Sequence, residues 1–395
     1  KEAGLQEPVG LIMKIQIIAL IIAFLILPSS GISKDKNVIP DVKRINYSWA
    51  SERVHKPFWG ISVADLNGDG TKHTLLLERS RLSIGTFQGK KYVEAISCEW
   101  PGDSKGAKLD VFDFDNDGDA EAFITGVDDG VPSSIILDYE GGECKTVMKD
   151  IRWSLRKTDL FSPKGQVLVG QWWNSHDYFA GPVYEVKIGK KKLKKGKRVP
   201  LPWRSKLYQF TLLHNVGDSL SVVLQKGFAS LQLRERVGKK FKKIWQSPRR
   251  FGGSINLLPA DTRRVLGEEK SGYVTFDVPP TVINTPSGLR MLAVHQDMPL
   301  KGFVGRRPYI RSSDIVIFNE DPALGFIEDT RTVMLPGAVA DYAIDNTGEN
   351  GAKRLFVLVL EGVEFFEKDA SSAVFAFDIA GSNIAVPTAE SAMKK

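Results

Sequence analysis

The stretch Asp113-Phe114-Asp115-Asn116-Asp117-Gly118-Asp119-Ala120-Glu121 predicts how this chain folds. Carboxylates occupy its first, third, fifth and ninth positions, and a glycine occupies the sixth. Oxygen ligands at alternate positions, a glycine that permits a sharp turn and a closing acid are typical of a loop that binds Ca²⁺. Residues 108–112 before it and 122–126 after it have the composition of strands. We therefore expect a hairpin with a calcium-binding turn, not a helix–loop–helix site.

The strand–loop–strand pattern recurs along the chain, which indicates an internal repeat with a period of roughly 50 residues. Each copy continues with two further strand-like runs, so that one unit has four short strands. Many units end in a turn that contains tryptophan. Copies start near residues 61, 108, 157, 209, 282 and 340, and the tryptophans of these turns are Trp100, Trp153, Trp203 and Trp245.

Four short strands at this period predict an all-β fold, a single β-propeller of four-stranded antiparallel blades. Six units are recognisable, and an array of β-sandwiches is the alternative to a ring. The gap between the fourth and fifth units contains strand-like runs at 254–258 and 273–277, which form either an inserted hairpin or a seventh blade. The last unit lacks a fourth strand of its own, and residues 45–51 have the pattern of one. We therefore expect the N-terminal strand to close the ring.

The N-terminal region has the pattern of a secretory signal peptide. Met13 and Lys14 precede an apolar run, and small residues follow it up to Ser33. Cleavage after Ser33 would place the mature protein in the periplasm, on the cell surface or outside the cell, with no transmembrane segment left. An uncleaved membrane anchor is the alternative. The expected organisation is upstream residues plus signal peptide at 1–33, an N-terminal segment with the closing strand at 34–56, the propeller at 57–380 and a C-terminal tail at 381–395.

The charge and the cysteines limit the partners and the compartment. Among 395 residues with a formal net charge of +7, Cys98 and Cys144 are the only cysteines. They stand about one repeat apart, and the sequence leaves open whether they pair, as an exported protein permits. The basic run Lys190–Arg198 is expected at a turn between third and fourth strands, where it contacts an anionic surface or is simply solvated. Nucleic acid is not expected as a partner, since no recognition motif accompanies the charge.

The repeat resembles the FG-GAP/VCBS type found in integrin-like propellers and in many exported bacterial proteins. Its loop has the pattern Asp-x-Asp-x-Asp-Gly-x-x-Asp/Glu, which Asp113, Asp115, Asp117 and Glu121 match in full, with the Asp119 carbonyl at the usual backbone position. The resemblance implies a calcium-stabilised propeller that is used for binding, and the family has no shared catalytic chemistry. An ordinary acidic hairpin turn is the alternative to a metal site.

Two other loops match this pattern less completely. In the first unit Asp65, Asn67 and Asp69 fit the leading positions, but His73 replaces the closing acid. This loop is a second candidate for Ca²⁺. In the sixth unit Asp345 begins a similar loop, and a lysine stands where the acid belongs, so that its ammonium group would compete with a cation.

The connections between second and third strands are expected on the face opposite the calcium loops. Two of them are rich in aromatic and polar residues, a combination that suits a saccharide or a peptide. The alternative is that the aromatic side chains pack on one another and fill the mouth of the propeller. The candidate ligand-binding residues are Trp172, Trp173, His176 and Asp177 in one connection and His295, Arg306 and Tyr309 in the other.

Catalytic motifs are not recognisable in the sequence. The five histidines have no metal-ligand spacing, and no nucleophile or phosphate-binding motif is present. Asp177 and Asp297 could converge as the paired acids of a glycosidase. We expect an exported, calcium-stabilised binding or scaffold module for a protein or glycan partner at the cell envelope. The alternatives are a hydrolase that acts on an envelope polysaccharide and a subunit that docks through its basic patch.

Overall fold

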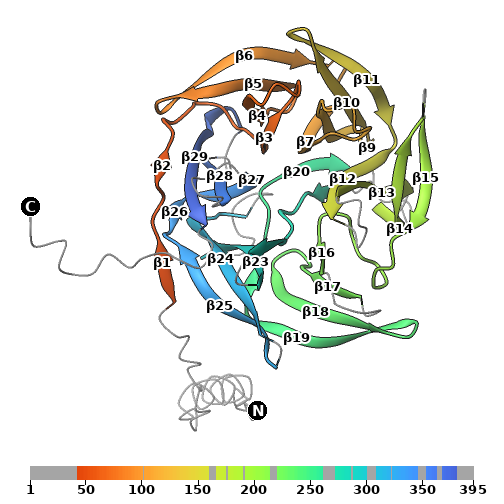
Figure 1. Cartoon of the computed structure of the whole chain (residues 1–395), viewed down its shortest axis with the longest axis vertical. Helices are drawn as coiled ribbons and strands as arrows, with labels where there is room; N and C mark the ends of the chain where they lie inside the picture. Colours follow the sequence, from red (N-terminus) through yellow and green to blue (C-terminus); the bar gives the residue numbers. More distant parts are fainter. Residues whose placement is uncertain are drawn as a thin grey trace, which may run out of the picture. The chain divides into compact units, whose positions relative to one another are not determined.

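The computed structural model describes residues 42–100, 102–159, 166–174, 177–189, 192–213, 220–260, 272–285, 288–299, 308–321, 323–345, 353–362 and 367–379. The expected signal peptide and C-terminal tail lie outside these residues. The described residues form six sheets, each built on four antiparallel strands and arranged as the blades of a β-propeller (Figure 1). The predicted fold class is therefore confirmed.

The first three blades follow one another along the chain. Blade 1 contains β3 (Gly60–Asp65), β4 (Lys72–Leu77), β5 (Arg81–Gln88) and β6 (Lys91–Glu99). Blade 2 contains β7 (Lys105–Phe112), β8 (Glu121–Asp128), β10 (Ser134–Glu140) and β11 (Glu143–Ile151), with the short β9 (Val131–Pro132) beside β8. Blade 3 contains β12 (Trp153–Asp159), β13 (Gln166–Asn174), β14 (Asp177–Ile188) and β15 (Leu193–Arg198).

The other three blades complete the ring. Blade 4 contains β16 (Phe210–Leu213), β17 (Ser221–Leu224), β18 (Ala229–Val237) and β19 (Lys240–Phe251). Blade 5 contains β22 (Thr281–Thr285), β23 (Gly288–Asp297), β24 (Ser312–Asp321) and β25 (Gly325–Thr332), with β26 (Leu335–Pro336) beside β24. Blade 6 contains β27 (Ala338–Asp345), β28 (Lys353–Glu361), β29 (Ser371–Ile379) and β2 (Trp49–Ala50).

The N-terminal strand closes the ring, as predicted. Trp49 and Ala50 of β2 pair with Ala376 and Phe375 of β29, so that β2 is the outermost strand of blade 6. An additional strand just before it, β1 (Lys43–Ile45), pairs in parallel with β25 of blade 5. The sequence did not predict β1, because three residues are too few to show a strand period. The N-terminal segment thus ties two blades together.

The gap between blades 4 and 5 contains an inserted hairpin. Its strands are β20 (Leu257–Ala260) and β21 (Gly272–Thr275), which pair only with each other among the described residues. Asn256, just before β20, donates a hydrogen bond of 2.6 Å from Nδ2 to the Ala107 carbonyl of blade 2 and accepts one of 2.8 Å from Arg79. The insertion therefore reaches across to blades 1 and 2, and the seventh-blade alternative is wrong.

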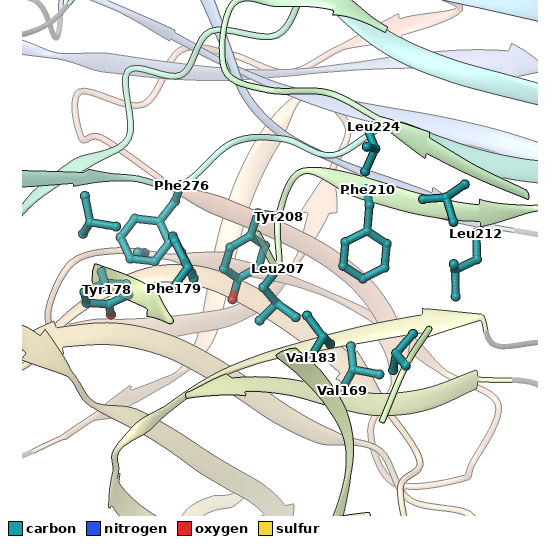
Figure 2. Packing of buried hydrophobic residues seen from close by; sticks show 14 of the residues in the cluster. Val169, Tyr178, Phe179, Val183, Leu207, Tyr208, Phe210, Leu212, Leu224 and Phe276 are labelled. Carbon is teal, nitrogen blue, oxygen red and sulfur yellow. The ribbon is translucent and has the colours of Figure 1, made fainter. Parts of the chain in front are cut away.

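Apolar side chains fill the space between neighbouring blades. Inner strands such as β17 are buried along their whole length, because both of their faces pack against other blades. Outer strands such as β11 are mostly exposed. In the cluster around blades 3 and 4, Phe276 from the insertion packs edge-on against Tyr178, Phe179 and its neighbours (Figure 2). The buried apolar residues therefore form separate clusters between neighbouring blades.

Blades 1 and 2 are also joined covalently. Cys98 of β6 and Cys144 of β11 form a disulfide, with their Cα atoms 5.6 Å apart. The bond connects the outermost strands of the two blades. The sequence left open whether these two cysteines pair, and in the structure they do.

Candidate metal centre and surrounding surfaces

The acidic loop of blade 2 is the hairpin turn between β7 and β8. Asp113 accepts hydrogen bonds from the backbone N–H groups of Asn116 at 2.7 Å and Gly118 at 3.1 Å. Both donors have positive φ angles, 64° for Asn116 and 103° for Gly118, a region that glycine and asparagine tolerate best. Glu121 accepts a hydrogen bond of 3.0 Å from the Phe114 N–H. The first and last acids therefore fix the shape of the turn.

This turn brings three carboxylates together. Asp113, Asp115 and Asp117 each offer an oxygen, and these oxygens all lie within 4.8 Å of one another. Because Ca²⁺ binds oxygen at about 2.3–2.6 Å, two ligands of one ion lie at most about 5 Å apart. Burial, together with the negative charges of Asp115 and Asp117, raises the pKa of Glu121 to about 7. Asp113, Asp115 and Asp117 could therefore hold a hard divalent cation, which would neutralise this repulsion.

The corresponding loop of blade 1 satisfies its acids internally. Asn67 donates from Nδ2 to Asp69 at 2.9 Å, and the Thr71 N–H donates to the same carboxylate at 2.6 Å. The hydrogen bonds from Thr71 and then Asn67 lower the pKa of Asp69. Asp65 accepts a bond of 2.7 Å from the Gly70 N–H. Within the part of the chain that the structure describes, only the Asp113 group forms a cluster of three potential metal ligands.

The loops of blades 1 and 2 are in contact. Gly68 has φ of +66°, and a Cβ at this position would lie 3.0 Å from the Gly118 carbonyl oxygen. The Ala120 N–H donates to the Leu66 carbonyl at 3.4 Å. Ion binding in one loop would therefore affect the backbone of the other.

The sixth loop begins at a buried aspartate that already has a cationic partner. Asp345 forms an ion pair with Lys72 at the start of β4 in blade 1. The residues that follow it, 346–352, lie outside the described residues. The Asp345 carboxylate therefore joins blades 1 and 6.

The predicted connection at 172–179 does join the second and third strands of a blade, but it is much shorter than predicted, because most of these residues belong to the strands. Trp172 and Trp173 belong to β13 and Asp177 begins β14, so that only residues 175 and 176 lie between the strands. Successive strand residues point to opposite faces. Accordingly Trp172 packs edge-on against Trp153, with the two ring centroids 5.3 Å apart. Trp173 packs instead against the hydrophobic cluster around blades 3 and 4. The two indole rings do not form one platform, and His176 lies outside the described residues.

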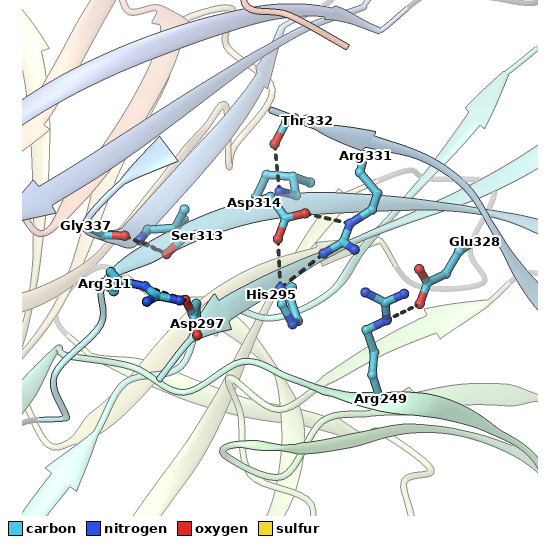
Figure 3. A network of polar contacts seen from close by, with 12 residues as sticks. Arg249, His295, Asp297, Arg311, Ser313, Asp314, Glu328, Arg331, Thr332 and Gly337 are labelled. Carbon is cyan, nitrogen blue, oxygen red and sulfur yellow. Dashed lines mark hydrogen bonds and ion pairs between the residues drawn. The ribbon is translucent and has the colours of Figure 1, made fainter. Parts of the chain in front are cut away.

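The second predicted connection starts later than expected. His295 and Asp297 belong to β23. Tyr309 is a half-buried loop residue, and Arg306 lies outside the described residues. His295 Nδ1 lies 2.8 Å from Asp314, whose other carboxylate oxygen accepts from Arg331 Nε at 2.6 Å (Figure 3). Although burial opposes them, hydrogen bonds from His295 and Arg331 lower the pKa of Asp314. His295 is thus part of an internal ion-pair network of blade 5.

The two acids considered for hydrolysis have local partners in separate blades. Asp177, in blade 3, accepts a hydrogen bond of 3.1 Å from the Phe179 N–H. Asp297, in blade 5, forms an ion pair with Arg311. Blade 4 stands between them in the ring, and neither lines the central cavity.

The innermost strands enclose a central cavity of about 500 Å³. Five of its lining residues are ionic: Lys108, Asp110, Arg156, Lys157 and Asp341. Arg156 donates to the carbonyls of Leu207 at 2.8 Å and Phe210 at 2.7 Å, near and in blade 4. These residues were not predicted from the sequence. Charged residues within otherwise apolar strands are the pattern that indicates them, because such side chains are rarely buried without a partner.

These ionic side chains connect neighbouring blades. Lys157 of blade 3 donates to the Val111 carbonyl of blade 2 at 2.8 Å, and Lys108 of blade 2 lies 3.4 Å from Asp341 of blade 6. Burial raises the pKa of Asp341 to about 6, with the Lys108 charge opposing the shift. The charged side chains of the cavity therefore link neighbouring blades at the centre of the ring.

The basic patch lies where it was predicted, as far as the structure describes it. Lys194 to Arg198 belong to β15, after the turn between the third and fourth strands of blade 3. Lys240, Lys242 and Lys243 belong to β19, the fourth strand of blade 4, and are exposed. Lys190 lies outside the described residues. No helix in the described part of the chain is long and apolar enough to span a membrane.

Comparisons with known proteins leave the family open. A scan against models of known protein families finds no match. A search of curated proteins also finds no match. The resemblance to FG-GAP/VCBS repeats therefore stays a prediction that rests on the residues of the acidic loops.

Proposed function

We propose that this chain is an exported, calcium-stabilised propeller that serves as a binding or scaffold module for a partner at the cell envelope. The observation that carries the proposal is the group of three carboxylate oxygens within 4.8 Å at the tip of a propeller hairpin. In this position Ca²⁺ would be held by Asp113, Asp115 and Asp117, with Glu121 closing the loop. Its contribution is to neutralise these charges and so to fix the turn.

Export is supported by two further features. The disulfide between Cys98 and Cys144 is of the kind that persists in oxidising compartments. Met13 to Ser33 have the order of basic, apolar and small residues that a signal peptide requires. An extracytoplasmic compartment also supplies the calcium that a loop of this type needs.

A binding role is favoured over hydrolysis by the use of the internal charges. The ionic residues of the cavity bond to neighbouring blades, as Arg156 does to the Leu207 and Phe210 carbonyls. Asp177 and Asp297 have local partners in different blades. Among the described residues these side chains make internal contacts, which leaves the surfaces of the blades to contact a partner.

Thermal unfolding with and without calcium tests the proposal. At free Ca²⁺ of about 100 times its dissociation constant, the bound ion adds about 2.7 kcal/mol to the free energy of unfolding. Chelation should therefore lower the melting temperature of the wild type by several degrees, since about 1 kcal/mol corresponds to roughly 2–4 °C in a large domain.

The variant Asp115→Asn/Asp117→Asn provides the comparison. It should melt at the same temperature in calcium and in chelator, because it lacks two of the three clustered carboxylates. An equal calcium-dependent shift in the wild type and in this variant would show that the loop is not the site.

A further inference from the structure

The exposure of Trp203 sets it apart from the other tryptophans that end the units. Its side chain is 80% exposed, whereas Trp100 at the end of blade 1 is 5% exposed. Trp153 and Trp245 are half-buried, each packed against other aromatic rings. Exposing a whole indole ring to water is unfavourable by about 25 cal/mol per Å² of apolar surface. Of these four tryptophans, Trp203 in the connection from blade 3 to blade 4 is therefore the most exposed, while Trp153 and Trp245 lie in strands.

Hydrogen bonds to a buried side chain hold the segment that carries Trp203 in place. Gln171 is 1% exposed and donates from Nε2 to the carbonyls of Ser205 at 3.0 Å and Gly181 at 2.9 Å. Its Oε1 accepts from the Leu207 N–H at 2.8 Å. One buried amide thus clamps both this segment and the β13–β14 hairpin. A rigid anchor loses little conformational entropy on binding.

The backbone beside Trp203 is strained, which is a second unusual feature of this segment. Arg204 has a φ of 61°, in the left-handed region that side chains other than those of glycine and asparagine rarely adopt. Such conformations persist where the surrounding structure imposes them, and they concentrate at binding and catalytic sites. The hydrogen bond from the Ser205 hydroxyl to the Pro202 carbonyl, at 2.8 Å, closes this turn.

A small groove lies beside the indole ring. It has a volume of about 190 Å³, and its apolar lining includes Phe179, Val183, Leu201 and Pro202. Arg198 and Arg204 line it as well and are exposed. We refer to this cavity with Trp203 and the two arginines as the Trp203 groove. Its volume suits a single large apolar side chain.

The polar groups of the groove indicate the charge of its ligand. The Ser205 hydroxyl donates to a backbone carbonyl, and Asp177 accepts from the Phe179 N–H. The charged side chains that line the groove are Arg198, Arg204 and Asp177, so that cationic groups outnumber the single carboxylate. Guanidinium groups bind carboxylates in a bidentate manner. A saccharide would need several neutral donors and acceptors, which the apolar lining does not offer. Tryptophan and arginine are also the residues that dominate protein interfaces.

We propose that the Trp203 groove binds an acidic segment of a partner protein, which inserts one large apolar side chain into the cavity and places carboxylates against Arg198 and Arg204. The proposal rests on the binding-module function proposed above and names the surface and the chemistry of the partner. Trp203 covers the inserted side chain. The two arginines select for negative charge around it.

Selection from a random peptide library displayed on phage tests this proposal with the intact protein. Peptides selected on the wild type should contain a large apolar residue among several acidic ones. Measured by fluorescence anisotropy, the affinity of a selected synthetic peptide should fall at least about 30-fold in Trp203→Ala, the loss expected for an anchor residue. It should also fall in Arg198→Ala/Arg204→Ala and with rising salt.

Matched controls separate the groove from general charge and exposure. Leu324→Ala removes another exposed apolar side chain, and Lys90→Ala/Lys91→Ala removes the same charge from exposed positions of blade 1. Both should bind the peptide like the wild type, and all variants should keep its melting temperature.

Three results would overturn the proposal. Peptides that bind Trp203→Ala as tightly as the wild type would exclude the groove and leave the binding-module function standing. Selection of no acidic peptide would exclude the acidic partner. Binding of oligosaccharides that depends on Trp203 would replace the protein segment by a glycan. Calcium-dependent stability is unaffected by any of these outcomes, so the two proposals fail separately.

Discussion

The junction between blades 1 and 2 and the junction between blades 3 and 4 use the same repeat in different ways. At the first, the disulfide of Cys98 and Cys144 joins the outer strands, and Trp100 is buried with its indole N–H donating to the Ser104 carbonyl at 3.0 Å. At the second, the contacts are internal bonds from Arg156 and Gln171, and Trp203 is exposed. One connecting tryptophan is therefore part of a packed core, and the other is exposed to solvent.

On this basis we propose that the stabilising bonds and the binding surface lie in different sectors of the ring. The acidic loops that touch each other belong to blades 1 and 2, beside the covalent bond. The lining of the Trp203 groove comes from blade 3 and from its connection to blade 4. Buried hydrogen bonds of Arg156 and Gln171 stabilise this junction. Metal and disulfide would thus stabilise one sector while another presents its surface.

Truncating the two tryptophans is expected to give the largest difference. Trp100→Ala should lower the free energy of unfolding by about 3–5 kcal/mol, because it leaves a large cavity in a packed site. Trp203→Ala should change it by less than about 0.5 kcal/mol, since the side chain is exposed. Urea unfolding of both variants measures the contrast. Similar losses of unfolding free energy in the two variants would contradict the assignment of one tryptophan to the core and the other to the surface.

Removing the disulfide should have the next largest effect. Cys98→Ala/Cys144→Ala should lose about 2–4 kcal/mol of stability, mainly because the unfolded chain gains conformational freedom. The same loss should appear when the wild type is unfolded in a reducing agent, and the variant itself should not respond to that agent. A wild type that is indifferent to reduction would mean that the bond does not form in solution.

A pH series extends the comparison to the charges inside the ring. The pKa of Asp341 is about 6 in the folded protein against 3.8 as its ordinary value, so that the folded state binds this proton more tightly. Its contribution to stability therefore falls as pH rises towards 6 and is constant above. Between pH 5 and pH 7 the change is about 1 kcal/mol.

Asp341→Asn isolates this titration. The difference in unfolding free energy between the variant and the wild type should shift in favour of the variant by that amount from pH 5 to pH 7. A difference that stays constant with pH, or that shifts in favour of the wild type, would contradict the raised pKa.

The ring itself could be predicted from the sequence, because four-strand units and their turns recur at a regular spacing. Strand exchange at the termini was visible in residues 45–51 as well. Loop boundaries were less predictable, since Trp172 and His295 look like loop residues and are held in strands by pairing with Ala180 and Asp314. Pairing partners distant in sequence decide such cases.

The candidate sites show the same limit. The Asp113 loop could be predicted because all its ligands lie within nine consecutive residues. The Trp203 groove could not, because its lining comes from the β13–β14 hairpin, β15 and the connection that follows. Nothing local distinguishes Trp203 from Trp100, and only the packing around each determines which one is exposed.

Calorimetric titration of the metal-stripped protein with Ca²⁺ tests the central claim most directly, on the wild type, Asp115→Asn/Asp117→Asn and Asp65→Asn/Asp69→Asn. We expect one saturable site in the wild type, its loss in the first variant and its retention in the second, because among the described residues only the Asp113 loop brings three carboxylates together. Undiminished binding in the first variant, or its loss only in the second, would contradict it.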